Sequence, residues 1–339
     1  MASNTPNGIL AYDWDSATGD LTAAGVAAEI PIVDYVIFSP RKDYLFAACE
    51  VREFEGKHTG EVASYSVSGG KLTQLTARNS AGPGTCQVAL DHTGRVLISA
   101  DYGGGSAASF LVTDGKLSEP VWTEHYTGHG PNPMRQRTPH AHFASFAPNN
   151  RFAYINDLGL DMIHIYRVDT KTAMLTPAGG YHGKPGVGCR TLHFHPNGHT
   201  AYCMNELSST VDILEWNAND GSLTRKSSIN LVPEGAETHG CDTVISRDGK
   251  SVYFANRGNN SIYFYRADYK TGDLTKVDRI DCGGKTPRFF TLDPTERWVL
   301  VANQDSSLIS VFKRNTSTGD IAKEGKTVAA ATPMCILFE

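Results

Sequence analysis

Short runs of alternating hydrophobic and polar residues, separated by turn sequences, recur along the whole chain. The clearest copy is residues 188–224, where alternation predicts strands at Thr191–His195, Thr200–Met204 and Val211–Trp216. Pro196-Asn197-Gly198 and Asn219-Asp220-Gly221 supply the turns, because Asn and Gly tolerate the positive φ that tight hairpins need. Since no stretch shows helical periodicity over three turns, the pattern predicts an all-β protein.

The same arrangement repeats at a nearly constant interval. In each copy a strand ends in a characteristic pair of residues, and the next strand begins five residues later. Most copies then close with a glycine turn and a fourth strand, as in TGDLT at 18–22 and GGKLT at 69–73. The second members of the pairs, 46 to 56 residues apart, are Asn4, Glu50, Asp101, Asp157, Glu206, Arg257 and Gln304. Seven copies of about four short antiparallel strands predict a seven-bladed β-propeller.

The two ends of the sequence complement each other. Met334–Phe338 (MCILF) resembles an innermost strand such as Cys86–Leu90, whereas the N-terminus supplies only later strands, starting with Ile9–Trp14 and a short strand within Met1–Asn4. We therefore expect the C-terminal strand to complete the N-terminal blade. This closure makes residues 1–339 a single domain and removes two exposed sheet edges.

Composition narrows the range of partners. Hydrophobic residues at 40% and charged residues at 20% are typical of a soluble globular protein. A net charge of -5 without a basic cluster argues against nucleic acid, and no apolar run approaches the roughly 18 residues of a membrane span. We expect neither nucleic-acid nor membrane binding, and a monomer or weak homo-oligomer.

The cysteines indicate a compartment. The seven cysteines are scattered singly without a C-x-x-C pair, as expected for reduced thiols in a cytoplasm-like environment. Met1 is followed by polar ASNTPNG, which lacks the build of a signal peptide, although the chain begins within a repeat. We therefore expect a cytoplasmic protein.

Two positions in each repeat should face one mouth of the central channel. In a four-stranded blade the innermost strand begins at the face where the second strand ends. One set of positions is the series of pair residues given above. The other set, at the start of the inner strands, is Asp34, Cys86, His142, Arg190, Cys241, Arg288 and Cys335.

One sector of this mouth contains several charged and titratable residues. Consecutive copies contribute His142, Arg190, Glu206, Arg257, Arg288 and Gln304. Guanidinium groups bind carboxylate or phosphate bidentately, and a histidine that titrates near neutrality can transfer protons. The sector predicts a catalytic mouth that binds a small anion.

Further candidates lie beside this sector. His140 shares a face with His142 in an extended chain, and His239 lies two residues before Cys241, so both are candidates for substrate binding. His140-x-His142 could form half of a metal site, but no third ligand has supporting spacing, so we expect no metal and no cofactor. Gly103-Gly104-Gly105 is not a phosphate loop because no helix follows it. The longer connections Arg52–Gly60, Trp122–Thr138 and Leu231–Gly240 are ordinary surface loops or carriers of function.

Over essentially its whole length the chain resembles the seven-bladed β-propeller lactonase family. That family includes bacterial propeller-type 6-phosphogluconolactonases and the fungal 3-carboxy-cis,cis-muconate lactonizing enzyme. The most specific stretches are Thr138–Leu158, Phe194–Thr210, Asn256–Ser261 and Gly283–Ser306. The resemblance implies that His142, Arg190, Glu206 and Arg257 are catalytic. Thr191 departs from the Arg-His pair that is usual in the family, which bears on substrate fit.

The resemblance implies a lactonase that hydrolyses a sugar lactone similar to 6-phosphogluconolactone. On this hypothesis Arg190 and Arg257 bind the anion and stabilise the oxyanion, while His142 or Glu206 activates water. Arg288, Gln304, His140 and His239 would orient the substrate. A cycloisomerase that forms a lactone from a carboxymuconate is an alternative. A non-catalytic interaction propeller is another, although it predicts an apolar patch at the mouth rather than arginines.

Overall fold

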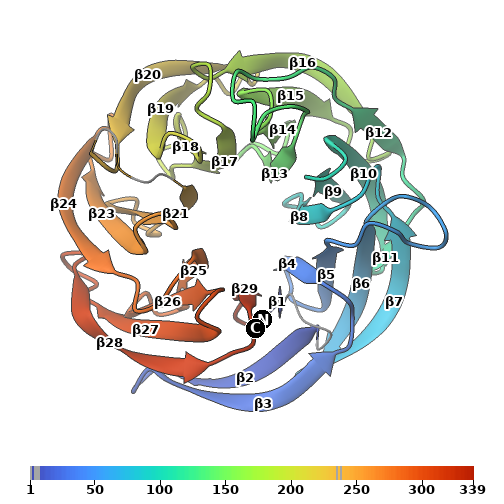
Figure 1. The fold of residues 1–339 in the computed structure, drawn as a ribbon. Coiled ribbons are helices and arrows are strands. Elements are labelled where there is room, and N and C mark those ends of the chain that lie inside the picture. The colour runs from blue at the N-terminus through green and yellow to red at the C-terminus, as the bar shows by residue number, and fades with distance from the viewer. Residues whose placement is uncertain (1, 4–7, 234–235, 237–238) are drawn as a thin grey trace.

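The computed structural model describes residues 2–3, 8–233, 236 and 239–339, and every regular element in this part of the chain is a β-strand. The strands form antiparallel sheets set side by side around a central axis, so the protein is an all-β propeller (Figure 1). The described residues include no helix with the length and hydropathy to cross a membrane.

Six sheets are built from consecutive segments of the chain. Their innermost strands are β4 (Val33–Phe38), β8 (Thr85–Leu90), β13 (Ala141–Phe146), β17 (Cys189–Phe194), β21 (Gly240–Ile245) and β25 (Pro287–Leu292). The second strands are β5 (Tyr44–Cys49), β9 (Val96–Asp101), β14 (Phe152–Asp157), β18 (Thr200–Asn205), β22 (Ser251–Asn256) and β26 (Trp298–Asn303).

The remaining strands lie progressively further from the axis. The third strands are β6 (Glu61–Ser68), β10 (Ser106–Thr113), β15 (Met162–Val168), β19 (Thr210–Trp216), β23 (Ser261–Ala267) and β27 (Leu308–Arg314). The outer strands are β7 (Lys71–Asn79), β11 (Lys116–Leu117), β12 (Trp122–His125), β16 (Leu175–His182), β20 (Leu223–Asn230), β24 (Leu274–Asp281) and β28 (Ile321–Ala329).

A further sheet combines the two ends of the chain. Its order is β29 (Pro333–Cys335), β1 (Ala2–Ser3), β2 (Ile9–Asp15) and β3 (Asp20–Ala28), with Ala2 opposite both Cys335 and Ile9. The expected strand Met334–Phe338 is wrong in length, because the short β1 offers few residues for pairing. Met1 and Asn4, also assigned to this region, lie outside the described residues.

The core lies between neighbouring sheets rather than in one central mass. All six residues of β18 are buried, since adjacent blades cover both faces of the strand. On one side, Phe152 and Tyr154 pack with Leu192 and Trp216. Each sheet therefore depends on its neighbours to exclude water from its apolar side chains.

A tyrosine in the second strand joins each of three sheets to the next. The hydroxyls of Tyr154, Tyr202 and Tyr253 donate to the carbonyls of Gly221, Gly272 and Gly319 at 2.8, 2.8 and 2.5 Å. At Gly221 φ is 81°, and a Cβ would lie 2.6 Å from the Phe152 ring. Glycine is thus required in this turn both by its backbone conformation and by the approach of the preceding blade.

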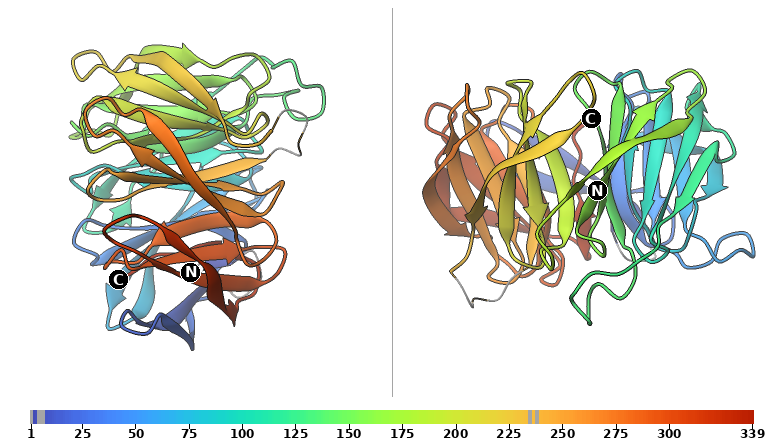
Figure 2. Two further views of the ribbon diagram at one scale, coloured as in Figure 1. Left: turned by 90° about the vertical axis from the view of Figure 1, so that its left-hand side faces the viewer. Right: turned by 90° about the horizontal axis from the view of Figure 1, so that it is seen from above.

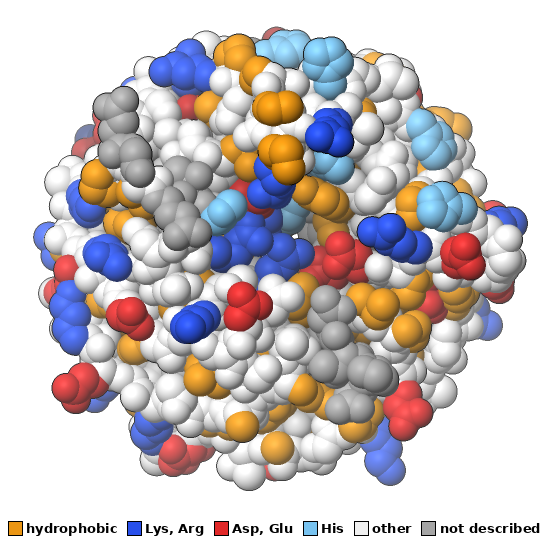
Figure 3. All heavy atoms as spheres, in the orientation of Figure 1, with side chains coloured by type: hydrophobic (Ala, Val, Ile, Leu, Met, Phe, Trp, Pro, Cys, Tyr) orange, Lys and Arg blue, Asp and Glu red, His pale blue; other side chains and the backbone are white. Residues whose placement is uncertain are grey.

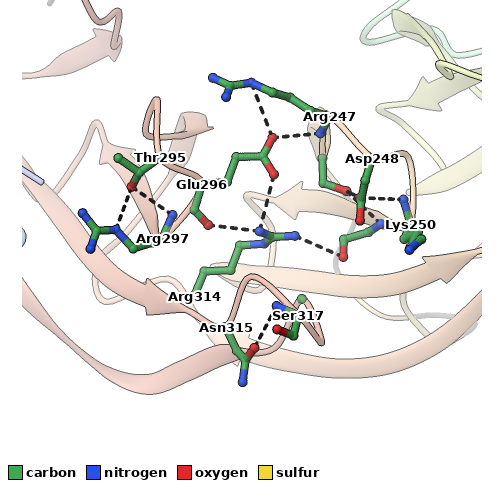
Figure 4. Close-up of polar contacts among 12 residues, drawn as sticks. Arg247, Asp248, Lys250, Thr295, Glu296, Arg297, Arg314, Asn315 and Ser317 are labelled. Carbon is green, nitrogen blue, oxygen red and sulfur yellow. Dashed lines mark hydrogen bonds and ion pairs between the residues drawn. The ribbon is translucent and has the colours of Figure 1, made fainter.

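Arg314 strengthens the last of these junctions (Figure 4). Its Nε donates to the Tyr253 hydroxyl at 2.6 Å and its Nη1 to the Glu296 carbonyl at 3.0 Å. The guanidinium also lies 3.6 Å from the Glu296 carboxylate, and Arg314 is only 3% exposed. Trp216 has the same role two junctions earlier, where its Nε1 donates to the Tyr154 hydroxyl at 2.7 Å.

Candidate active site

A polar cavity of about 210 Å³ opens at the mouth of the central channel. The residues that line it are Glu50, Cys86, Tyr102, Arg135, His142, Arg190, Glu206, Arg257 and Arg288. Figure 3 shows basic, acidic and histidine side chains gathered in the hollow at the centre of the ring. Starts of inner strands, ends of second strands and one loop all contribute to this lining, as expected for the channel mouth.

A β-bulge places each inner-strand residue in the cavity. The pairing of β17 with β18 skips from Cys189 to Thr191, and that of β13 with β14 skips from Ala141 to Phe143. The skipped residues are therefore Arg190 and His142. Corresponding shifts occur at Cys86 and Arg288, and at Asp34 just outside the lining. Because a bulged residue leaves the ladder, its side chain is re-aimed, here towards the channel.

Glu206 is the centre of the charged network. Its Oε1 lies 2.6 Å from Arg135 Nη2, and its Oε2 lies 2.5 Å from Arg190 Nη1 and 2.6 Å from Arg257 Nη2. Burial favours a higher pKa for Glu206, but the Arg257 and Arg190 charges outweigh it and hold the pKa well below its usual range. Glu206 is therefore a carboxylate that organises three guanidinium groups.

His142 lies against the same network. Its Nε2 is 2.5 Å from Arg190 Nη1, and an arginine can only donate, so Nε2 accepts and the proton is on Nδ1. Burial, reinforced by the Arg190 charge, lowers the pKa of His142 well below its usual value. The imidazole is thus neutral near pH 7. Its Nδ1 has no hydrogen-bond partner among the described residues.

A smaller chamber of about 30 Å³ adjoins the cavity along the channel. Four residues line both spaces, namely His142, Arg190, Arg288 and Cys86. Thr191 lines the chamber but not the cavity. This volume has room for a water molecule. The threonine at position 191, where the family usually has histidine, therefore bears on the chamber rather than on the cavity at the mouth.

Arg288 and Glu50 form a second acidic and basic group in the cavity. Arg288 Nη2 donates to Asp34 Oδ2 at 2.9 Å. Burial and the nearby Asp34 carboxylate raise the pKa of Glu50 to about 7, partly offset by the Arg288 charge. Two glutamates in one cavity thus have pKa values displaced in opposite directions.

Arg135 and Tyr102 are lining residues that the sequence did not single out. Arg135 belongs to the loop of residues 126–140, which projects beyond one face of the ring (Figure 2). Arg135 Nη2 also donates to the Tyr102 hydroxyl at 3.3 Å. The loop is anchored by buried Gln136, whose Nε2 donates to the Leu158 carbonyl and Asp161 Oδ1 at 2.9 and 2.8 Å. The only sequence signal was the length of this connection.

The predicted site residues are distributed unevenly. His142, Arg190, Glu206, Arg257 and Arg288 all line the cavity, whereas Gln304, His140 and His239 do not. His140 instead stacks on Tyr102, with ring centroids 4.4 Å apart, and its Nδ1 lies 2.9 Å from the Tyr102 carbonyl. Substrate binding by Gln304, His140 and His239 stays a prediction.

Two of the pair residues that were predicted to face the channel mouth instead stabilise the loops around it. Asp101 accepts hydrogen bonds from Thr85, Ser106 and the Gly82 amide. Asp157 accepts from the amides of His140 and Leu160. Both side chains hold loops at the mouth and neither lines the cavity. The described residues contain no group of three or more His, Cys, Asp or Glu that could hold a metal ion.

The comparison with known families agrees with this geometry. Residues 1–338 match the family described as lactonase, 7-bladed beta-propeller. The chain belongs to this lactonase family. It is 32% identical over 336 residues to a 6-phosphogluconolactonase of Bacillus subtilis, covering 98% of this chain and 94% of that protein.

Two further similar proteins extend the comparison. The chain is 29% identical over 325 residues to a 6-phosphogluconolactonase of Formosa agariphila, covering 93% of this chain and 91% of that one. The structure of a periplasmic gluconolactonase of Pseudomonas aeruginosa superimposes with a TM-score of 0.90 at 28% identity, covering 98% and 96% of the two chains. This protein is therefore a 6-phosphogluconolactonase-like member of the family.

Proposed function

We propose that this protein hydrolyses a small anionic sugar lactone similar to 6-phosphogluconolactone. The observation that carries the proposal is the group of three guanidiniums around Glu206 in a cavity at the channel mouth. The lining contains four arginines and two glutamates, so positive charge prevails and favours an anion. Charge-assisted hydrogen bonds from guanidiniums suit a phosphate or carboxylate.

The exposures of the arginines suggest their roles. The Arg135 and Arg257 side chains are 34% and 16% exposed, whereas Arg190 is 5% exposed. We therefore assign Arg135 and Arg257, the more exposed of the three, to binding the anionic group as it arrives from solvent. Arg257 Nε is buried and has no hydrogen-bond partner among the described residues. Arg190 lies deeper, where a guanidinium stabilises the oxyanion that forms when water adds to the lactone carbonyl.

Hydrolysis forms a bond between the water oxygen and the carbonyl carbon and breaks the bond from that carbon to the ring oxygen. One proton moves from water to a base and then to the departing ring oxygen. The sequence predicts His142 or Glu206 as this base. In this structure His142 Nε2 already accepts a hydrogen bond from Arg190, and the Glu206 carboxylate is paired with three guanidinium groups.

A comparison of substrates tests the proposed function. The purified protein is given 6-phosphogluconolactone, gluconolactone and 3-carboxymuconate, and proton release on ring opening or proton uptake on ring closure is followed at constant pH with the uncatalysed rate subtracted. We expect hydrolysis of both lactones, with a higher kcat/KM for the phosphorylated one because its anion meets Arg135 and Arg257. Ring closure of the muconate without lactone hydrolysis would support a cycloisomerase instead. Absence of turnover on all three would overturn the proposal.

Replacing Arg135 by methionine should weaken substrate binding more than it weakens the fold. Loss of one charged hydrogen bond, worth about 1.5–3 kcal/mol, predicts a rise in KM of roughly 10- to 100-fold for the phosphorylated lactone. Gln136, not Arg135, anchors the loop, so the melting temperature should change little. Arg137→Met is the matched control, since Arg137 is an exposed residue of the same loop that does not line the cavity. Equal KM values for the two variants would contradict this role for Arg135.

Three further features belong to the proposal. We infer that the ring has seven blades and is closed by the pairing of β29 with β1, supported by Ala2 opposite Cys335. We infer residence in a reducing compartment, supported by seven buried, unpaired cysteines. We also infer that the protein acts as a monomer or weak homo-oligomer.

A further inference from the structure

Glu50 occupies a distinct place in the cavity wall. It directly follows β5, where its backbone amide donates to the Ile32 carbonyl at 2.8 Å, and it lines the cavity with Cys86 and Arg288. Its carboxylate makes no hydrogen bond or ion pair with the residues that the structure describes. Of the two glutamates in the lining, Glu50 is therefore the one with no cation bound to its carboxylate among the described residues.

The neighbouring ion pair between Arg288 and Asp34 explains why the Glu50 carboxylate has no bound cation. Arg288 directs Nη2 to Asp34 at 2.9 Å, so its nearest carboxylate is Asp34 rather than Glu50. The charged and titratable groups around Glu50 are Asp34, Arg52, Cys86, Tyr102 and Arg288. Burial keeps the pKa of the Cys86 thiol well above its usual value. A carboxyl with a pKa of about 7 is thus the group in this part of the cavity suited to proton transfer at neutral pH.

Close backbone packing fixes the wall beside Glu50. Gly84 has φ of 73°, and a Cβ there would lie 3.1 Å from the Gly103 amide and 3.9 Å from Glu50 Cγ. The Gly84 amide donates to the Val51 carbonyl at 2.9 Å, and its carbonyl accepts from the Tyr102 amide at 2.8 Å. The small residues Gly84 and Gly103 therefore let two loop backbones approach closely beside Glu50.

We propose that Glu50 is the general base that activates the attacking water, a role that rests on the proposed lactonase function. The Glu50 carboxylate takes one proton from water as the water oxygen bonds to the lactone carbonyl carbon. The bond from that carbon to the ring oxygen then breaks, and the proton passes from Glu50 to the ring oxygen. Arg190, Arg257 and Arg135 hold the anionic substrate and the oxyanion, while Glu206 keeps these guanidiniums in place.

Glu50→Gln tests the role directly, because glutamine keeps the shape of the side chain but cannot accept the proton. We expect kcat for lactone hydrolysis to fall at least about 100-fold, with KM within about threefold of the wild-type value. The wild-type kcat/KM should decline as the pH falls below about 7, since the carboxylate form is the active one. This acidic limb should be absent from the residual activity of the variant.

Glu61→Gln is the matched control. Burial also raises the pKa of Glu61 to about 7, and Glu61 pairs with Cys49 next to Glu50, but it does not line the cavity. We expect this variant to keep the wild-type kcat and acidic limb. If the wild type hydrolyses lactones and Glu50→Gln matches it in kcat and pH profile, the role of Glu50 is overturned and the lactonase function stands. If the folded wild type hydrolyses no lactone, both proposals fail.

Discussion

Replacing Glu206 by glutamine is expected to lower the free energy of unfolding by about 3–5 kcal/mol, as measured by urea denaturation at pH 7. Glu206 is 2% exposed and lies within 2.6 Å of three guanidinium groups. A neutral amide would leave these three cations close together without their counter-charge, with Arg190 buried among them. The same change should abolish measurable lactone turnover, because the arginines would no longer be held in position.

Inorganic phosphate provides a specific check on this explanation. Phosphate bound among the uncompensated arginines should raise the melting temperature of Glu206→Gln more than that of the wild type. Glu215→Gln, an exposed position on β19 of the same blade, should change stability by less than about 0.5 kcal/mol. A Glu206→Gln protein as stable as the wild type, with no response to phosphate, would contradict the account.

The pH dependence of the difference has a defined sign. The folded pKa of Glu206 is lowered, so its stabilising contribution is present above the unfolded pKa, about 4.3, and is lost as pH falls through the folded value. The stability gap between wild type and variant should therefore be constant near neutrality and shrink in acid below about pH 4.

The second large effect is expected at Arg314, on the face opposite the cavity. Arg314→Met removes the donors to the Tyr253 hydroxyl, the Glu296 carbonyl and the Ser251 hydroxyl, as Figure 4 illustrates in part. Because charged hydrogen bonds contribute about 1.5–3 kcal/mol each and are not additive, we expect a loss of about 2–4 kcal/mol in the free energy of unfolding. Catalytic constants should not change.

Arg266→Met serves as the control for that experiment. Arg266 occupies β23 of the preceding blade, its side chain is 57% exposed, and its nearest carboxylate, Asp320, is 4.0 Å away. Exposed pairs of this kind contribute little, so its removal should cost less than about 0.5 kcal/mol. Equal losses in the two variants would show that Arg314 does not link the blades as described.

Much of the site follows from the repeat pattern alone. Strand alternation and turn glycines predict the blades, and the repeat frame brings Arg190 and Glu206 to one face although they come from different strands. The frame works here because the same bulge recurs at the start of β13, β17 and β25, so a fixed offset from the turn identifies the skipped residue. Five of the six residues of the predicted sector line the cavity, whereas Gln304 does not.

The remaining features depend on contacts between distant segments. Arg135 reaches Glu206 from an insertion, 71 residues earlier in the chain, and no periodicity encodes that approach. Asp101 has the same repeat position as Glu206, yet neighbouring hydroxyls and an amide turn it into the scaffold. Glu50 was among the pair residues predicted to face the channel mouth. Its raised pKa, however, arises from burial and from the nearby Asp34 carboxylate, and only the folded chain brings these about.

The anchoring of loop 126–140 has a consequence for changing specificity. Gln136 fastens the loop to Leu158 and Asp161, which lie outside the cavity, while the adjacent Arg135 points a charge into it. Residues on this loop can therefore be exchanged as a cassette, with Gln136 retained, while the pairing of β12 and β13 within their sheets is left intact. We expect exchanges at such loop positions to alter substrate preference while the strands of the ring keep their pairing.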